Sequence, residues 1–363
     1  MADEVNTTRV HLAERSYDIQ IGSGNLGLLS SFLQKNCGSN HAVIITDTNV
    51  DSLYADKLGD QLAAEQWEVH ILVVDAGELS KCPEVASDLW ETMLNEGTDR
   101  QSIVVAVGGG VVGDLAGYVA ATFTRGLGFF QVPTTLLAQV DSSVGGKVGI
   151  NLPGAKNMVG AFWQPLGVLI DVDVLATLPE REYRAGLGEV VKYGVILDAD
   201  FFVYLEQNVD AINSYDGPTL TYIVQRCCRL KAEVVEQDER ETTGLRAVLN
   251  YGHTFAHAFE AAGNYGELLH GEAVSIGMMC AARLAQRMGR IDNSFVNRQQ
   301  SLLESLSLPI ATPNYDADDL LALMKRDKKV DEGRLRFVLP DRLGHVELVK
   351  NVRTEDVLAS LEA

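Results

Sequence analysis

Four short apolar runs, each separated from the next by a helix-like segment, constrain the fold of this chain most strongly. They cover residues 41–47, 69–75, 102–107 and 129–132, and the first three are rich in Val and Ile. Uninterrupted runs of this kind are typical of parallel strands covered by helices on both faces. Two shorter, partly alternating runs within residues 8–21 indicate a hairpin. The first half therefore predicts a doubly wound, Rossmann-like α/β domain, in which ligands bind beyond the carboxyl ends of the strands.

The second half of the chain has a different pattern, because helical periodicity dominates it. Helices are expected at residues 184–196, 219–237, 254–262, 272–288 and 317–325, and strands only at 335–339 and 346–349. A chain of 363 residues is also longer than one typical single-core domain. We therefore expect two domains, an α/β domain over residues 1–178 and a helical domain over residues 179–363.

The charge balance limits the partners of the protein. Thirty Lys and Arg residues against fifty Asp and Glu residues give a formal net charge of −20. This balance argues against non-specific binding to nucleic acids or anionic membranes, but a local group of cations can still bind a small anionic substrate. The five cysteines form no C-x-x-C motif, and residues 1–9 show no signal-peptide pattern. We therefore expect reduced thiols in a cytoplasmic protein, and no apolar run approaches the roughly 18 residues that span a bilayer.

A glycine-rich segment at residues 108–114 follows a predicted strand and begins a predicted helix. It contains the spacing G-x-G-x-x-G, in which backbone N–H groups and a helix N-terminus can bind a pyrophosphate. The acid that usually follows about 20 residues later is missing, whereas Asp47 ends an upstream strand. A simple glycine-rich turn is the alternative, but a dinucleotide site with an unusual strand order fits the pattern better.

Polar and basic residues are concentrated between residues 134 and 157, beside apolar runs. Gly145 and Gly146 precede Lys147, so an anion can approach the backbone closely with a cation behind it. Arg125 adds a second basic group upstream. The alternative is a solvated loop, but in so acidic a chain these cations indicate an anion site.

Three histidines and one glutamate of the second half form a candidate metal site. His253 and His257 lie four residues apart and so on one helix face, His270 follows a glycine-containing turn, and Glu189 lies on an earlier helix. Two histidines and a carboxylate with an open coordination position are typical of catalytic zinc. Spacing alone does not decide which two histidines bind, and a buried core histidine is the alternative. Residues 231–241 alone predict an exposed helix with salt bridges.

Seven segments, in this order, together resemble the 3-dehydroquinate synthase family of sugar-phosphate cyclases. The resemblance extends from about Asp47 to the segment Asp327-Lys328-Lys329. The segments are GGGVVGDLAG, VPTTLLAQVDSSVGGKVGIN, KNMVGAFWQP, GLGEVVKYG, DERE, LNYGHTFAHAFE and LHGEAV. No one of them is specific, but their combination is.

The resemblance implies an N-terminal NAD-binding domain, a helical C-terminal domain, an active site between them and a homodimer. It also implies one divalent metal, zinc or cobalt, with Glu189, His253 and His270 as ligands. His257 and Glu241 would then be acid/base groups. The implied NAD contacts are Asp47, Asn49, Glu78, Lys81, Gly109, Gly110, Val111, Asp114, Thr134, Thr135 and Thr177, with Asp141, Lys147 and Lys156 beside them. The implied substrate contacts are Arg125, Asp141, Lys147, Lys156, Asn157, Lys192, Lys231, Arg246 and Asn250, with Lys328 or Lys329.

The implied reaction converts 3-deoxy-D-arabino-heptulosonate 7-phosphate into 3-dehydroquinate and phosphate. A hydride is removed from C5 to NAD, phosphate is eliminated, the hydride is returned and an intramolecular aldol step closes the ring. Among these groups, Lys147, Asn157, Lys192, Arg246 and Asn250 would assist the chemistry. Two alternatives are a sister cyclase that makes an inosose or a valiolone, and a metal-dependent polyol dehydrogenase. The set Asn157, Arg246 and His257 favours the dehydroquinate synthase reaction over these alternatives, because a substrate carboxylate needs a bidentate cation such as Arg246.

Overall fold

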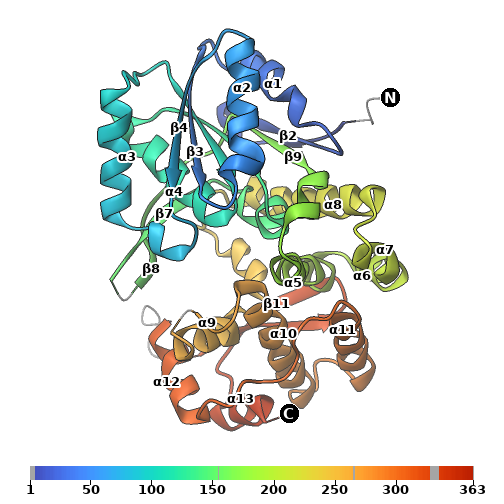
Figure 1. Cartoon of the computed structure of the whole chain (residues 1–363). Coiled ribbons are helices and arrows are strands. Elements are labelled where there is room, and N and C mark those ends of the chain that lie inside the picture. The colour runs from blue at the N-terminus through green and yellow to red at the C-terminus, as the bar shows by residue number, and fades with distance from the viewer. Residues whose placement is uncertain (1–4, 154, 265, 328–334, 363) are drawn as a thin grey trace. The chain divides into compact units, whose positions relative to one another are not determined.

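The computed structural model describes residues 5–153, 155–264, 266–327 and 335–362 of the chain. These residues form two compact units (Figure 1). The first unit contains Met1–Leu178 and Leu220–Arg240, and the second contains Pro179–Thr219 and Glu241–Ala363. The expected division after residue 178 therefore differs from the structure in the segment 220–240.

A seven-stranded sheet forms the centre of the first unit. Its strand order is β1-β2-β9-β6-β5-β3-β4, in which β1 and β2 are antiparallel and the other neighbours are parallel. The strands are β1 (Asn6–Val10), β2 (Tyr17–Gly22), β3 (His41–Asp47), β4 (Glu68–Val74), β5 (Ile103–Gly108), β6 (Gly128–Pro133) and β9 (Gly167–Asp171). The predicted parallel sheet and its N-terminal hairpin are confirmed.

Both faces of this sheet are covered by helices, which explains the uninterrupted apolar runs. Helices α1 (Leu29–Asn36) and α2 (Asp56–Ala64) pack on one face with Ala42 and Ile44. Helices α3 (Pro83–Asn95) and α4 (Gly110–Thr122) pack on the other face with Val43 and Ile45. Successive residues of a strand point to opposite faces, so both sets of residues in β3 are buried and nearly all of them are apolar.

The polar stretch after β6 contains a hairpin that the sequence pattern did not predict. Strand β7 (Lys147–Leu152) pairs with β8 (Ala155–Phe162), and Gly149 lies opposite Gly160. A Cβ at Gly149 would lie 2.7 Å from the carbonyl oxygen of Val159, so only glycine permits this approach of the two backbones. Strand β9 was also not predicted, although all of its residues are buried.

Helix α8 (Gly217–Gln237) was expected in the helical domain, but most of it belongs to the first unit. The thiol of Cys228 donates to the carbonyl of Gln139 at 3.2 Å, and Arg229 donates to the carbonyl of Arg9 at 2.9 Å. These contacts join segments far apart in sequence, so the periodicity of the helix does not reveal them. The correction transfers Lys231 to the first unit.

The second unit is mainly helical, as the sequence pattern predicts. Its other helices are α5 (Glu180–Leu197), α6 (Ala199–Gln207), α7 (Val209–Asn213), α9 (His253–Ala262), α10 (His270–Arg287), α11 (Asn293–Ser305), α12 (Ala317–Asp327) and α13 (Thr354–Leu361). Strands β10 (Arg336–Arg342) and β11 (His345–Lys350) pair as an antiparallel hairpin. Helices α6, α7, α11 and α13 were not among the predicted segments.

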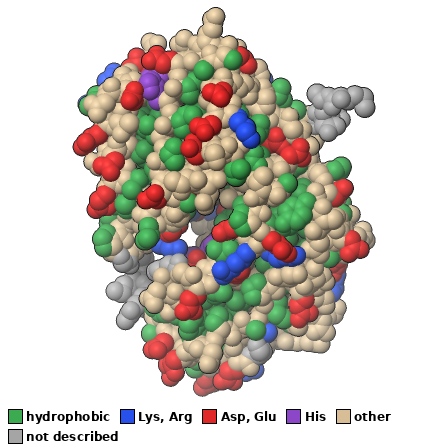
Figure 2. All heavy atoms as spheres, viewed as in Figure 1, with side chains coloured by type: hydrophobic (Ala, Val, Ile, Leu, Met, Phe, Trp, Pro, Cys, Tyr) green, Lys and Arg blue, Asp and Glu red, His purple; other side chains and the backbone are tan. Residues whose placement is uncertain are grey.

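Acidic side chains are scattered over the face drawn in Figure 2, and basic side chains are seen there in only a few places. This distribution agrees with the formal charge of −20. Among the described residues, no helix combines the length and the apolar character that crossing a membrane requires.

Candidate functional site

Glu189, His253 and His270 come together within the second unit. One ligand atom from each of them lies within 4.8 Å of the other two. The Nε2 atoms of His253 and His270 are each 3.5 Å from Oε1 of Glu189. These are the three residues that the family resemblance implies as metal ligands. A carboxylate and two imidazoles at these distances suit a divalent metal of the zinc class.

Closely packed glycines bring the three ligand-bearing segments together. A Cβ at Gly188 on α5 would lie 2.5 Å from the carbonyl oxygen of Gly271 on α10, and one at Gly271 would overlap the carbonyl of Ala185. Gly252, which precedes α9, has a φ of +81° and would meet the backbone nitrogen of Met278 at 2.7 Å. Each glycine is adjacent in sequence to a ligand, so these backbone contacts determine how closely the ligands approach.

Neighbouring groups orient both histidine rings. His253 donates through Nδ1 to the carbonyl of Tyr251 at 3.2 Å, which leaves its Nε2 lone pair facing Glu189. His270 Nδ1 lies 3.3 Å from Oε1 of Glu260. Metal-bound histidines usually make such contacts with their second nitrogen, since these fix the tautomer and the ring orientation.

The two histidines have opposite pKa shifts. Burial lowers the pKa of His253 to about 3, and the charge of Lys192 acts in the same direction. Burial also acts to lower the pKa of His270, but hydrogen bonds with Glu189 and Glu260 outweigh it and raise that pKa above its ordinary value. His253 is therefore neutral and ready to coordinate at neutral pH, whereas a metal must displace a proton from His270.

Two other predicted residues of the second unit, Lys192 and His257, contact this cluster, and Arg246 pairs with Glu241. Lys192 is 2% exposed and forms an ion pair with Glu189. His257 is exposed one turn further along α9, with its ring centroid 5.5 Å from that of His253. Arg246 is buried, with Nε 3.4 Å from Oε1 of Glu241.

The remaining predicted substrate contacts of this half of the chain are Asn250 and Lys328 or Lys329. Asn250 is exposed at the end of the short helix Leu245–Asn250. Lys328 and Lys329 lie outside the described residues.

In the first unit, three predicted nucleotide segments meet at one edge of the sheet. Asp47, Gly108 and Pro133 end the parallel strands β3, β5 and β6, so the segments that follow them begin at the same edge. The Asp47 carboxylate accepts hydrogen bonds from the backbone N–H groups of Asn49 and Val50, at 2.9 and 3.1 Å.

The glycine-rich loop at this edge has little space for side chains. A Cβ at Gly109 would lie 3.0 Å from the methyl carbon of Thr135, and one at Gly110 would lie 3.1 Å from Oγ of Ser142. Val111 follows as the second residue of α4. Thr134 is buried and its N–H donates to the carbonyl of Gly108 at 2.9 Å, while its Oγ1 has no hydrogen-bond partner in the described part of the chain.

Lys81 connects three segments of this edge. Its Nζ donates to Asp114 on α4 and to Asn157 on β8, both at 2.5 Å. Burial raises the pKa of Asp114, and the charge of Lys81 opposes that shift. Asn151 donates to Glu78 at 2.7 Å and so ties the same hairpin to the segment before Lys81.

The remaining predicted anion contacts of the first unit are less concentrated. Lys231 is 6% exposed and pairs with Asp141, with 3.0 Å between Nζ and Oδ1. Lys147 and Arg125 are exposed, and Lys156 is half-buried on β8. The hydroxyl oxygen of Thr177 lies 2.7 Å from that of Tyr54.

Three residues that hold these sites in place were not predicted. Glu260 contacts His270, Asn151 binds Glu78, and Ser142 lies beside Gly110. Glu260 is seven residues after His253 and therefore lies on the same face of α9, a signal that the sequence contains. The other two depend on the hairpin and on a turn, for which the local sequence gave no indication.

Solved structures with the same architecture define the class of the protein. A 2-deoxy-scyllo-inosose synthase, complexed with carbaglucose-6-phosphate, NAD+ and Co2+, is similar with a TM-score of 0.89 and 29% identity, over 98% of this chain and 99% of that one. A 2-epi-5-epi-valiolone synthase from Streptomyces hygroscopicus, with NAD+ and Zn2+ bound, is similar with a TM-score of 0.88 and 30% identity, over 97% of each chain. A probable glycerol dehydrogenase from Sinorhizobium meliloti, at 16% identity and a TM-score of 0.66, shares the fold alone. The fold of this chain is therefore that of these cyclases, and its Glu189, His253 and His270 cluster is a candidate metal site.

Sequence comparisons then give the family. The 3-dehydroquinate synthase N-terminal model matches residues 71–185, and the C-terminal model matches residues 186–330. A 3-dehydroquinate synthase from Rhodopirellula baltica is 49% identical over 100% of this chain and 98% of its own length. One from Desulforamulus reducens is 48% identical over 98% of this chain and 99% of its own length. The chain belongs to the 3-dehydroquinate synthase family.

Proposed function

We propose that this enzyme converts 3-deoxy-D-arabino-heptulosonate 7-phosphate into 3-dehydroquinate and phosphate. The observation that carries the proposal is the meeting of Glu189, His253 and His270 in a chain that is 49% identical, over its whole length, to a 3-dehydroquinate synthase. The proposed class is a phosphate-eliminating carbon–oxygen lyase that needs NAD and a divalent metal.

The residues of the second unit fit a divalent metal. Glu189, His253 and His270 would hold it, because both Nε2 atoms face the Glu189 carboxylate. Tyr251 and Glu260 contact the opposite nitrogens of the two rings. Zinc and cobalt both suit this set of one carboxylate and two imidazoles.

The sheet edge of the first unit fits a dinucleotide. Gly109 and Gly110 leave room for a pyrophosphate at the start of α4, where backbone N–H groups attract anions. The buried Oγ1 of Thr134, which lacks a partner, offers a further hydrogen bond there. Asp47, at the end of β3, is the acid proposed for the ribose.

The chain's own residues then have distinct tasks. When bound, NAD would supply a hydride acceptor that is restored within each turnover, and the metal would act as a Lewis acid towards substrate hydroxyls. Lys147 and Lys156 would bind the phosphate through single ammonium charges, and Arg125 through the two parallel N–H groups of its guanidinium. Arg246 would bind the substrate carboxylate in the same bidentate way. His257 would move protons near neutral pH.

The two alternatives receive less support. The inosose and valiolone synthases are 29% and 30% identical to this chain, compared with 48–49% for the 3-dehydroquinate synthases. The glycerol dehydrogenase shares the fold alone, and hydride transfer alone leaves the group of lysines without a task.

One experiment tests the proposed function. The substrate is deuterated at C5, and phosphate release and absorbance at 340 nm are followed together. We expect dependence on NAD, steady phosphate release, no net NADH, and deuterium at the corresponding carbon of the product. Stoichiometric NADH formation would instead identify a dehydrogenase, and the absence of phosphate release would overturn the cyclase proposal.

A homodimer in the cytoplasm belongs to the same proposal. All five cysteines are free thiols, as a reducing compartment requires. Light scattering on the purified chain would give the mass of the assembly, and a monomer at working concentration would contradict this part of the proposal.

A further inference from the structure

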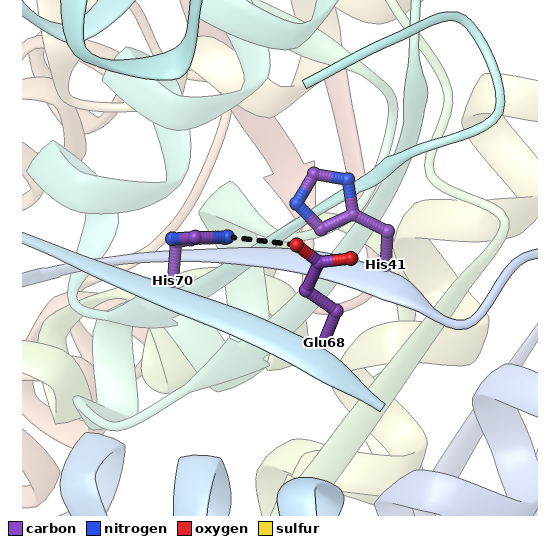
Figure 3. A group of neighbouring side chains, drawn as sticks. All are labelled: His41, Glu68 and His70. Carbon is purple, nitrogen blue, oxygen red and sulfur yellow. Dashed lines mark ion pairs between the residues drawn. The ribbon is translucent and has the colours of Figure 1, made fainter. Parts of the chain in front are cut away.

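A second group of potential metal ligands lies in the first unit, on neighbouring strands of the sheet. His41 begins β3, and Glu68 and His70 lie on β4. Glu68 is the register partner of His41, and His70 follows two residues later on the same face. One ligand atom from each residue lies within 4.8 Å of the others. Figure 3 shows both imidazole rings beside the Glu68 carboxylate.

Hydrogen bonds fix the tautomer of His41. The Ser102 hydroxyl donates to Oδ1 of Asp99 at 3.1 Å and lies 2.8 Å from Nδ1 of His41. A hydroxyl has one proton, so when Ser102 donates it to Asp99, Nδ1 of His41 is the donor in the second contact. The neutral ring therefore has its lone pair on Nε2.

His70 is held in the same way from another direction. Its Nδ1 lies 3.0 Å from a carboxylate oxygen of Glu96, just after α3, and its Nε2 is 3.6 Å from Oε1 of Glu68. The Nε2 atoms of both His41 and His70 are buried and have no hydrogen-bond partner among the residues that the structure describes. A carboxylate that orients a histidine through Nδ1 is a common arrangement at zinc sites.

The result is a convergence of acceptors without a donor. Two imidazole lone pairs and one carboxylate face each other, and a divalent cation placed among them can accept electron density from all three. Glu68 has 69% of its side chain exposed and His70 has 23%, so an ion can enter from the Glu68 side and keep water as a further ligand. Imidazole nitrogens favour zinc, cobalt, nickel or copper over magnesium or calcium.

Another cluster in the described part of the chain shows the contrast. Asp341, His345 and Glu347 also lie within ligand distance of one another. There, however, Glu347 pairs with Arg290 at 2.6 Å, and His345 lies 2.8 Å from Asp341. An arginine already supplies the cation, so this cluster does not need a metal.

We propose that His41, Glu68 and His70 bind a second divalent metal of the zinc class, separate from the one at Glu189. His41 is at the amino end of β3, and Asp47, at the other end of this seven-residue strand, is roughly 20 Å away. The second metal is therefore remote from the nucleotide edge and has a structural task. It ties the edge strand β4 to β3 and, through Glu96 and Ser102, to the segments after α3 and before β5.

Metal counting on the full chain tests this proposal. Purified protein is stripped with a chelator, loaded with Zn2+ or Co2+, and analysed for metal per chain and, with Co2+, for visible absorption. We expect two equivalents in the wild type and one in either His70→Gln or His270→Ala. The double variant should bind none. The Co2+ spectrum of His270→Ala should therefore report the second site alone.

Three further variants keep the test decisive. Glu68→Gln changes an exposed side chain and should remove the same equivalent if His70→Gln folds poorly. Glu96→Gln keeps all ligands but should weaken the second site about ten- to a hundredfold. His11→Gln replaces an exposed histidine of the same unit and should leave two equivalents.

The outcomes separate a built site from adventitious binding. If the wild type binds one equivalent and His70→Gln does not lower it, the proposal is wrong. A loss of metal in His11→Gln equal to that in His70→Gln would indicate adventitious binding only and would also overturn it. Because the readout is metal content, failure here leaves the proposed catalytic function untouched.

Discussion

Replacing Gly188 by alanine is expected to remove the metal proposed at Glu189, His253 and His270 without substituting any of these three residues. The new Cβ would lie 2.5 Å from the carbonyl oxygen and 3.2 Å from the carbonyl carbon of Gly271. Unbonded carbon and oxygen atoms need about 3.3 Å, so α5 and α10 would separate by roughly 0.8 Å. Glu189 follows Gly188 on α5, and His270 precedes Gly271 on α10, so the displacement acts directly on the ligands.

The size of this displacement decides the outcome at the metal. Metal–ligand distances tolerate changes of about 0.2 Å, several times less than the expected separation. Gly188 lies within the 18-residue helix α5, where alanine would otherwise favour folding by about 0.5–1 kcal/mol. Overpacking of this kind costs about 1–3 kcal/mol, so the net effect should be destabilising. Helix propensity alone therefore predicts that the variant has a higher free energy of unfolding, whereas packing predicts a lower one.

The matched control is Gly217→Ala at the start of α8, where a Cβ would meet no atom within 4 Å. Bound metal, turnover and the unfolding midpoint are measured for both variants. We expect Gly188→Ala to lose one metal equivalent, most of its activity and some stability, and Gly217→Ala to resemble the wild type. Full metal content and raised stability in Gly188→Ala would refute the argument that backbone contact positions the ligands.

Three further predictions concern the proposed ligands and cations. His253→Ala and His270→Ala should each lose the metal proposed at Glu189 together with activity, whereas His257→Ala should keep that metal and mainly turn over more slowly. Elemental analysis of the purified variants measures the metal, and a metal-free His257 variant beside loaded His253 and His270 variants would contradict the assignment. Lys156→Ala and Arg125→Ala should weaken a non-reacting phosphonate analogue about ten- to a hundredfold, with little change for NAD; equal losses in parallel titrations would count against it. The raised pKa of His270 means that its ring holds a proton, which a metal must displace. The apparent metal affinity should therefore increase with pH, by up to about tenfold per pH unit below that pKa. Chelator competition at several pH values measures this slope, and an affinity independent of pH would contradict the prediction.

The parallel sheet could be predicted because burial on both faces leaves a local trace in the sequence. Every interior residue of β3 is apolar or a buried threonine, since Ala42 and Ile44 pack on one face and Val43 and Ile45 on the other. The hairpin β7–β8 leaves no such trace. Its close backbone approach depends on Gly149 and Gly160, which lie opposite each other on two strands, and a glycine in one strand does not indicate its partner in another.

The membership of the segment 220–240 shows a second limit of local patterns. A helix buries one apolar stripe whichever unit it packs on, so periodicity indicates a helix without indicating its partner. For α8 the partner follows from individual contacts, such as Lys231 with Asp141 and Cys228 with the carbonyl of Gln139. These pairs are about 90 residues apart in sequence, so only the folded chain shows them.

The histidine cluster shows why spacing left its ligands undecided. His253 and His257 are one helical turn apart and present the same chemistry to one face of α9. What distinguishes them is the backbone at the start of α9: the Tyr251 carbonyl orients His253, and Gly252 lets this end of α9 meet the backbone at Met278. His257 lies one turn further from that contact and is exposed. We therefore propose that backbone packing between helices selects the ligand, and Gly188→Ala tests that cause directly because it changes the packing and replaces no imidazole.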